Sequence, residues 1–225
     1  MKKALFAVIF VLACSAAIRS PAGQSGTDGI TASELLKQIE QTYGCGSFQA
    51  RFDQTSTLKA MDITDTASGR AYFMEPGKMR WEYVEPEAQQ IITDGNRLWI
   101  YKPQENQVLT GDVSALFGEG QGVSFLAAIG TIEEKNQVSI DHERQKEGYY
   151  TLKLVPDKKT ADITAIYFYV SKQSGLVEEL ETVNAYDDIT RIVLSDIRLG
   201  GTIDSSLFTF TPPEGADVML LDQKN

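Results

Sequence analysis

Apolar and polar residues alternate with a period of two along most of the chain beyond residue 46. In the segment 48–53, Phe48, Ala50 and Phe52 are separated by polar residues. Successive side chains of a strand point to opposite faces of a sheet, so this alternation predicts a strand with one buried face. The same pattern recurs in many of the segments that follow.

Turn residues separate several of these segments. Pro76-Gly77, Asp94-Gly95, Glu147-Gly148 and Ser174-Gly175 are typical of tight turns between neighbouring strands. The pattern therefore predicts a mainly β fold, about ten antiparallel strands in one curved sheet, rather than an α/β enzyme fold. The predicted strands span residues 48–53, 69–74, 79–84, 89–93, 98–101, 138–142, 149–155, 165–171, 176–184 and 189–198, with short closing strands at 208–210 and 218–221.

A helix is predicted directly before the first strand. Thr31 and Glu34 have the spacing of a capping box, in which each residue hydrogen-bonds to the backbone of the other. Gly44 and Gly46 are expected to end the helix. The apolar residues at helical spacing are Leu35, Leu36, Ile39 and Tyr43.

The alternation breaks over residues 111–136, where two short helical segments are predicted. Asp112 is a suitable cap for the first segment, and three glycines between residues 118 and 122 predict a flexible joint after it. Such short helices are marginal alone, so their apolar sides must lie against the sheet. These apolar residues are Leu116, Phe117, Val123, Phe125, Leu126 and Ile129.

Residues 1–22 have the layout of a secretory signal peptide. Two lysines precede the apolar run 4–13, which is shorter than the roughly 20 residues that a membrane span needs, and small residues follow it. The mature part, 23–225, is expected to be a single exported domain. Cys14 leaves two alternatives open: it is removed with the signal, or it is the lipidated cysteine of a loose lipobox.

Composition and charge narrow the function classes. The chain carries 31 acidic and 21 basic residues, a formal net charge of −10, which argues against nucleic acid because phosphate binding needs a basic face. One histidine and two cysteines leave no His/Cys metal cluster. Neither a nucleophile elbow nor a phosphate-binding glycine motif is present. We therefore expect no catalytic residues, no metal and no cofactor.

The predicted helices and sheet supply a large apolar surface. A curved sheet with short helices over its concave face can enclose a dry cavity, and such a cavity suits acyl chains better than hydride or phosphoryl chemistry. The alternative is that the same side chains simply fill a core. The alternation by itself leaves both alternatives open.

Four stretches of the sequence resemble the outer-membrane lipoprotein carrier protein (LolA) family. Their order and spacing hold across nearly the whole mature chain. They are 47–54 (SFQARFDQ), 76–83 (PGKMRWEY), 94–101 (DGNRLWIY) and 204–215 (DSSLFTFTPPEG), the last of which resembles the C-terminal signature of the family.

The resemblance implies a fold and a function. The family fold is an unclosed antiparallel β-barrel with a lid of short α-helices over an apolar cavity. The implied function is that of a monomeric periplasmic chaperone, which takes lipoproteins from an inner-membrane ABC transporter, shields their acyl chains and passes them to an outer-membrane lipoprotein receptor. The same fold occurs in lipid-anchored receptors and in lipid-sensing modules, which remain the alternative.

The residues expected to line the acyl-chain cavity follow from the alternation combined with the resemblance. Those on the sheet are Phe48, Phe52, Phe73, Trp81, Leu98 and Ile100. Those on the helices are Leu35, Ile39, Leu116, Phe117, Phe125, Leu126 and Ile129. Ile91 and Ile92 are both apolar, so the alternation does not decide which of them faces the cavity.

One position departs from the family pattern. In well-known members an arginine precedes the proline of the 76–77 turn and hydrogen-bonds to the lid, whereas this chain has Glu75 there. Lys78 and Arg80 are the candidate replacements for lid contacts. For Arg80 the alternative is an ordinary cross-strand pairing with acids such as Glu82.

Overall fold

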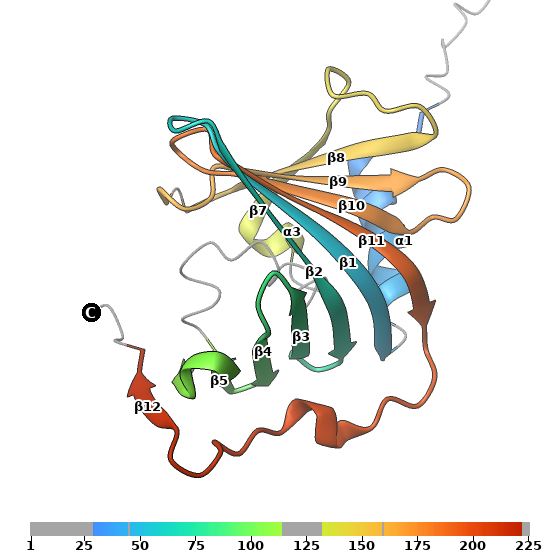
Figure 1. Cartoon of the computed structure of the whole chain (residues 1–225). Coiled ribbons are helices and arrows are strands. Elements are labelled where there is room, and N and C mark those ends of the chain that lie inside the picture. The colour runs from blue at the N-terminus through green and yellow to red at the C-terminus, as the bar shows by residue number, and fades with distance from the viewer. Residues whose placement is uncertain (1–28, 45, 114–131, 159, 222–225) are drawn as a thin grey trace, which may run out of the picture.

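The computed structural model describes residues 29–44, 46–113, 132–158 and 160–221, and a single sheet dominates them (Figure 1). Its twelve strands lie in the order β12-β6-β5-β4-β3-β2-β1-β11-β10-β9-β8-β7. The bounds are α1 Ala32–Tyr43, β1 Ser47–Leu58, β2 Ile63–Met74, β3 Lys78–Glu85, β4 Gln89–Asp94, β5 Arg97–Lys102, η1 Pro103–Glu105, β6 Gln107–Asp112, α3 Ile132–Lys135, β7 Asn136–Ile140, β8 Tyr149–Pro156, β9 Ala165–Ser171, β10 Val177–Val183, β11 Ile189–Leu199, η3 Ser205–Phe208 and β12 Asp217–Leu220.

The sheet is strongly curved and does not close on itself. The long strands β1, β2 and β11 cross the middle of the molecule, and α1 lies behind them (Figure 1). The end strands β12 and β7 are not paired with each other, so the sheet remains an open barrel. This architecture confirms the predicted unclosed, mainly antiparallel β-barrel.

Helix α1 forms as its sequence predicts. The hydroxyl of Thr31 accepts a hydrogen bond from the Glu34 backbone N–H at 3.2 Å, and the Glu34 carboxylate accepts one from the Thr31 N–H at 2.9 Å. These two bonds satisfy N–H groups that have no partner inside the helix. The helix ends at Tyr43, and its buried face packs on the concave side of the sheet.

Three strand predictions differ from the structure in existence or pairing, and β1 and β2 extend well beyond the predicted 48–53 and 69–74. Strand β6 was not predicted, because one of its buried positions is the polar residue Thr110 and the apolar alternation is therefore interrupted. Thr110 can be buried because its hydroxyl donates a hydrogen bond to the Leu98 carbonyl at 2.9 Å. The segment 208–210 is not a strand, since a 3₁₀ turn at Ser205–Phe208 precedes it. The predicted strand near the C-terminus does form as β12, but it pairs with β6 in parallel rather than antiparallel fashion.

Strand β4 is covered on both of its faces. Ile91 belongs to the concave core, whereas Ile92 points to the convex side and is also fully buried. The C-terminal segment provides the convex cover: η3 contacts β3 and β4, Phe208 is fully buried, and Phe210 lies 5.4 Å from the Tyr101 ring. Two buried faces explain why two successive isoleucines give no alternation.

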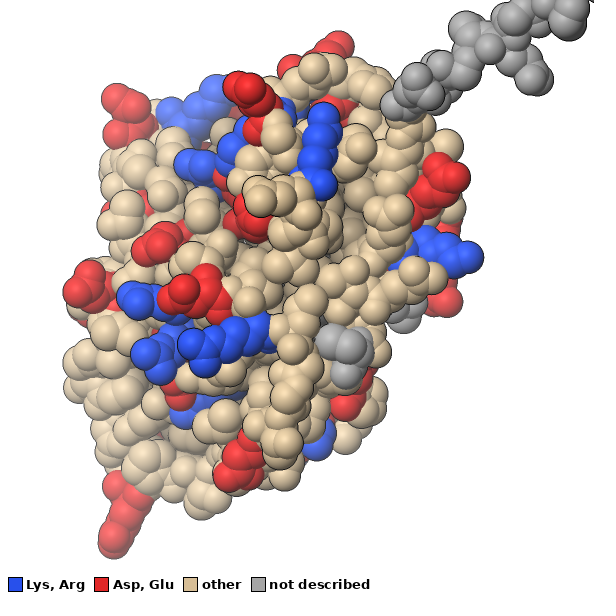
Figure 2. Space-filling model, turned by 90° about the vertical axis from the view of Figure 1, so that its right-hand side faces the viewer, with Lys and Arg blue, Asp and Glu red and all other residues tan. Residues whose placement is uncertain are grey.

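Charged side chains on the convex side of β9–β11 are mostly paired. Glu179 accepts hydrogen bonds from Arg191 Nε at 2.6 Å and from Lys146 Nζ at 2.6 Å, and Arg144 pairs with Glu181. Figure 2 shows basic and acidic side chains mixed over one side of the molecule, with several basic ones side by side in a band. This side of the surface is therefore mixed in sign even though the chain is acidic overall.

Replacing Gly69 with alanine is expected to destabilise the sheet. A Cβ at this position would lie 1.9 Å from the Glu82 carbonyl oxygen and 2.8 Å from Phe52 Cε1. The backbone contact cannot relax without moving β2 from β3, so the free energy of unfolding should fall by at least about 2 kcal/mol in a urea titration. Gly29→Ala is the control, because nothing lies within 4 Å of its Cβ position. Equal unfolding midpoints for the two variants would contradict this packing.

Phe208→Ala is expected to loosen the C-terminal segment. Its fully buried ring fills the space above β3 and β4, so the free energy of unfolding should fall by about 3–5 kcal/mol. Leu220→Ala serves as the control, since Leu220 is 78% exposed and its loss should change stability by no more than about 0.5 kcal/mol. A Phe208 variant as stable as the control would show that the segment does not belong to the core.

Candidate functional site

A chain of aromatic rings runs across the concave face from α1 to β3. Tyr43 of α1 meets Phe48 of β1 edge to face, with ring centroids 4.8 Å apart. Phe48 stacks on Phe73 of β2 at 4.2 Å, and Phe73 meets the Trp81 ring of β3 at 5.9 Å. Phe52 continues the chain, 4.6 Å from Trp81. Such pairs add stability beyond the area that they bury.

The strand register explains why these rings meet. Phe48 lies directly opposite Phe73, so the two rings form a cross-strand pair on one face. Phe52 lies opposite Gly69, where the missing side chain leaves room for its ring. Ala71 lies opposite Trp81, and its small side chain leaves room for the indole ring. Small residues on β2 therefore make space for large ones on β1 and β3.

The predicted site residues that the structure describes share one apolar cluster. Phe52 and Trp81 are 1% and 0% exposed, and Ile100 is half-buried at the margin of the cluster. The members from the prediction are Leu35, Ile39, Phe48, Phe52, Phe73, Trp81 and Leu98, with Ile100 packed against them. The predicted helical residues Leu116, Phe117, Phe125, Leu126 and Ile129 lie outside the described residues, as does Cys14.

The cluster also extends to strands where no site residues were predicted. These strands form the far half of the concave face, beneath α1, which contacts β7 and β8. The alternating apolar residues of the predicted strands 149–155, 165–171 and 189–198 were the available signal. The cluster members on these strands include Leu152, Phe168, Leu180, Ile192 and Leu194, and Tyr43, Met79 and Ile91 join the cluster from α1, β3 and β4.

Tyr43 attaches the C-terminal end of α1 to the sheet. Its hydroxyl accepts a hydrogen bond from the Val177 N–H at 3.0 Å and donates one to the Val177 carbonyl at 3.3 Å. Burial raises the pKa of Tyr43, so the hydroxyl stays neutral and keeps both bonds. Among the described residues, this is the hydrogen-bonded contact that holds the helix to β10.

Two further polar atoms lie at the apolar face. The Tyr83 hydroxyl donates to the Gln54 side-chain oxygen at 3.0 Å, and burial raises the pKa of Tyr83 to about 12. Trp81 Nε1 is buried and has no hydrogen-bond partner in the described part of the chain. A buried N–H without a partner is costly, so a ligand carbonyl at this position would recover a hydrogen bond.

The three candidate lid contacts lie elsewhere. Arg80 is on the convex face, where its Nε pairs with Glu82 at 2.6 Å and its Nη1 donates to the Leu207 carbonyl at 3.0 Å. Arg80 thus holds the C-terminal segment and pairs with an acidic residue, as the alternative interpretation expected, whereas the predicted lid segment lies outside the described residues. Glu82, the acidic partner of Arg80, lies on the same strand β3 and not on a neighbouring strand. Glu75 is exposed at the turn, where its backbone N–H donates to the Gly46 carbonyl at 2.8 Å, and Lys78 is half-exposed at the start of β3.

The described residues contain neither of two other kinds of site. In these ranges no three His, Cys, Asp or Glu side chains gather where they could hold a metal ion. None of the described helices has the length and apolar character needed to cross a membrane.

Comparison with known proteins identifies the family. Residues 44–211 match the family described as "Outer membrane lipoprotein carrier protein LolA". An outer-membrane lipoprotein carrier protein of Nitrosomonas europaea is 33% identical over 174 residues, which cover 77% of this chain and 82% of that protein. One of Chromobacterium violaceum is 30% identical over 217 residues and covers 96% of this chain and 98% of that protein.

A solved structure agrees with the architecture. An uncharacterised conserved protein from Thermus thermophilus superposes with a TM-score of 0.55 over 84% of this chain and 99% of that protein, at 13% identity. A likeness at this level of identity concerns the fold alone. Together with the match over residues 44–211 and the identities to whole carrier proteins, it leads to one conclusion: the chain belongs to the outer membrane lipoprotein carrier protein LolA family.

Proposed function

We propose that this protein is a periplasmic chaperone that holds the acyl chains of lipoproteins against its concave face and carries them from the inner to the outer membrane. The family consists of carriers rather than enzymes. The observation that supports the proposal is the continuous row of aromatic rings from Tyr43 to Trp81 on one face of an unclosed sheet.

Burial of methylene groups would provide the binding energy. Each methylene transferred from water to an apolar surface contributes about 0.8 kcal/mol, or about 11 kcal/mol for an acyl chain of about 14 methylenes. Acyl chains have no directional groups, so a surface of rings and aliphatic side chains suits them. The face that offers this surface spans β1 to β5 and β8 to β11.

A cover over this face would have to open before an acyl chain could enter. Phe52 and Trp81 are almost completely buried, so a ligand would reach them only after other side chains move away. Helix α1 is a suitable moving part, because twelve residues form a marginal helix in isolation and apolar packing holds most of it in place. Breaking the two Tyr43 hydrogen bonds would free its C-terminal end.

The unpartnered Trp81 N–H would provide orientation. Lipoprotein acyl groups are attached through ester and amide carbonyls, which accept hydrogen bonds. A carbonyl that reaches Trp81 Nε1 would satisfy the buried donor found there. Because a net hydrogen bond contributes about 0.5–1.5 kcal/mol, this contact would tighten binding by about 2- to 10-fold.

Export and the two membrane partners complete the proposal. The predicted signal peptide, residues 1–22, would direct the chain to the periplasm and then be removed together with Cys14; in the alternative, cleavage before Cys14 would leave it as the lipidated residue. An inner-membrane ABC transporter would supply the lipoproteins, and an outer-membrane lipoprotein receptor would accept them. The chaperone itself needs no cofactor for this transfer, because no covalent bond changes.

The two tryptophans of the chain allow a direct test of which face binds acyl chains. Trp81 lies on the concave face, whereas Trp99 lies on the convex face, 6.3 Å from Phe210. A triacylated cysteinyl peptide with brominated chains quenches tryptophan fluorescence on contact. In the Trp99→Phe variant the remaining Trp81 should be strongly quenched, and in the Trp81→Phe variant the remaining Trp99 should be largely unaffected.

The same variants also test the carbonyl contact. Trp81→Phe should weaken binding of the unbrominated peptide by about 2- to 10-fold relative to Trp99→Phe, since it removes the N–H and keeps an aromatic ring. Circular dichroism verifies that both variants fold. Equal quenching of the two tryptophans, or quenching of Trp99 alone, would rule out the concave face as the binding surface.

A further inference from the structure

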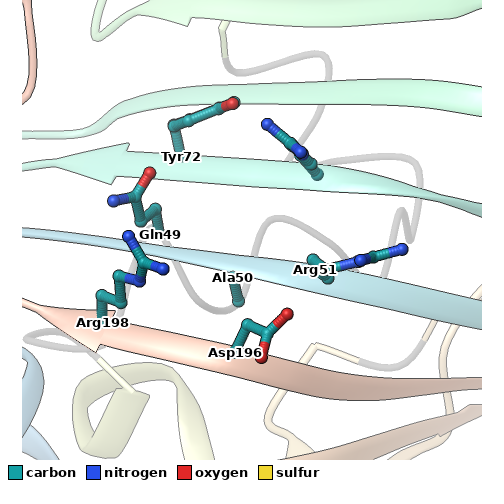
Figure 3. A pocket seen from close by; sticks show the side chains of 7 residues that line it. Gln49, Ala50, Arg51, Tyr72, Asp196 and Arg198 are labelled. Carbon is teal, nitrogen blue, oxygen red and sulfur yellow. The ribbon is translucent and has the colours of Figure 1, made fainter.

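The convex face carries a hollow lined by arginines, opposite in chemistry to the apolar concave face. Its volume is about 160 Å³, and it lies over β1, β2 and β11 (Figure 3). Since one water molecule takes up about 30 Å³ in the liquid, the hollow accommodates a group of several non-hydrogen atoms. The lining residues are Gln49, Ala50, Arg51, Arg70, Tyr72, Asp196 and Arg198.

The strand register concentrates positive charge at this hollow. Arg51 of β1 and Arg70 of β2 are direct cross-strand partners, and like charges in this position destabilise a sheet. Arg198 of β11 lies opposite Gln49, two residues from Arg51 along the sheet. All three arginines are exposed, and none of their guanidinium groups has a hydrogen bond or an ion pair to another described residue.

The lack of acidic partners contrasts with the paired side chains of Arg144, Lys146 and Arg191 on the same side of the sheet. Glu82 lies directly opposite Arg70, but its carboxylate pairs with Arg80 at 2.6 Å instead. Asp196 lines the hollow, yet no arginine nitrogen of the described residues lies within ion-pair distance of its carboxylate. With three arginines and one aspartate, the lining of the hollow thus has an excess of positive charge in a chain whose net charge is −10.

A β-bulge shapes the hollow. The pairing of β1 with β11 shifts between Gln49 and Arg51, so that Asp196 and Ile197 together face Ala50. Asp196 adopts a positive φ of 50°, a conformation that non-glycine residues adopt rarely. Bulges redirect side chains, and here Arg198 and Asp196 both line the hollow (Figure 3).

We propose that this hollow binds a phosphate-type oxyanion. Guanidinium groups match the oxygens of a phosphate with two parallel hydrogen bonds each, and an anion between Arg51 and Arg70 would relieve their mutual repulsion. The Tyr72 hydroxyl and the Gln49 amide can donate further hydrogen bonds. The phosphate group could belong to a soluble phosphate ester or to a phospholipid headgroup. The site is independent of the acyl-binding face, because the two lie on opposite sides of the same strands.

Titration calorimetry with inorganic phosphate at low ionic strength tests the site on the mature protein. Saturable binding is expected, together with a melting temperature that rises with phosphate concentration. Arg51→Gln and Arg198→Gln should each weaken binding by about 10- to 100-fold, as loss of a charge-assisted hydrogen bond does. Arg97→Gln is the matched control, since Arg97 is exposed on β5 and has no ion pair among the described residues.

A second measurement distinguishes the two sources of phosphate. Vesicles of phosphatidylglycerol in phosphatidylcholine are sedimented with the wild-type protein and with the same three variants. Phosphate binding that depends on Arg51 supports a site for a soluble phosphate. Vesicle binding that depends on Arg51, without binding of free phosphate, supports a headgroup site. The proposal would be overturned if the protein bound neither phosphate nor the vesicles, or if Arg97→Gln weakened binding as much as Arg51→Gln does.

Discussion

Burial of the concave apolar face is the constraint on which the rest of the structure depends. A sheet that does not close leaves this face to be covered by other elements, and among the described residues α1 is the longest of these. The helix meets the sheet through one apolar stripe and the Tyr43 hydroxyl. The cover is therefore held mostly by non-directional contacts, which an acyl chain can replace with contacts of the same kind.

The period of two gives each strand two separate chemical roles. On β2, Ala71 and Phe73 point into the apolar cluster, whereas Arg70 and Tyr72 line the charged hollow on the other side. The concave face is mostly apolar; the Tyr43 and Tyr83 hydroxyls at it are hydrogen-bonded, whereas Trp81 Nε1 is an unsatisfied donor. The convex face carries charged side chains and packs the C-terminal segment, which Arg80 holds through the Leu207 carbonyl. A carrier can thus use one face for its cargo and keep the other for different contacts.

Much of this arrangement could be predicted from the sequence, and the exceptions have physical causes. Alternation placed Phe48, Phe52, Phe73 and Trp81 on one face, because strands with one buried face show a clear period of two. Alternation did not separate the two faces of β4, because the C-terminal segment buries the second face as well. It did not predict β6, because the buried Thr110 is polar and satisfies its hydroxyl with a backbone hydrogen bond. The pairing of Arg80 with Glu82 was among the alternatives, but its bond to the Leu207 carbonyl was not, because local spacing does not show that η3 folds back over β3. The arginine hollow depends on a bulge between β1 and β11, which no local pattern reveals.

Site-specific photo-crosslinking tests the central claim most directly. A photoreactive benzoyl-phenylalanine replaces either Tyr83, which packs against the concave cluster, or Tyr72, which lines the convex hollow. Both positions are half-buried tyrosines on neighbouring strands, so they form a matched pair. After irradiation of intact cells, the account predicts crosslinks to palmitate-labelled lipoproteins from position 83 and not from position 72. Crosslinks from position 72 alone, or equally from both, would contradict binding of acyl chains on the concave face.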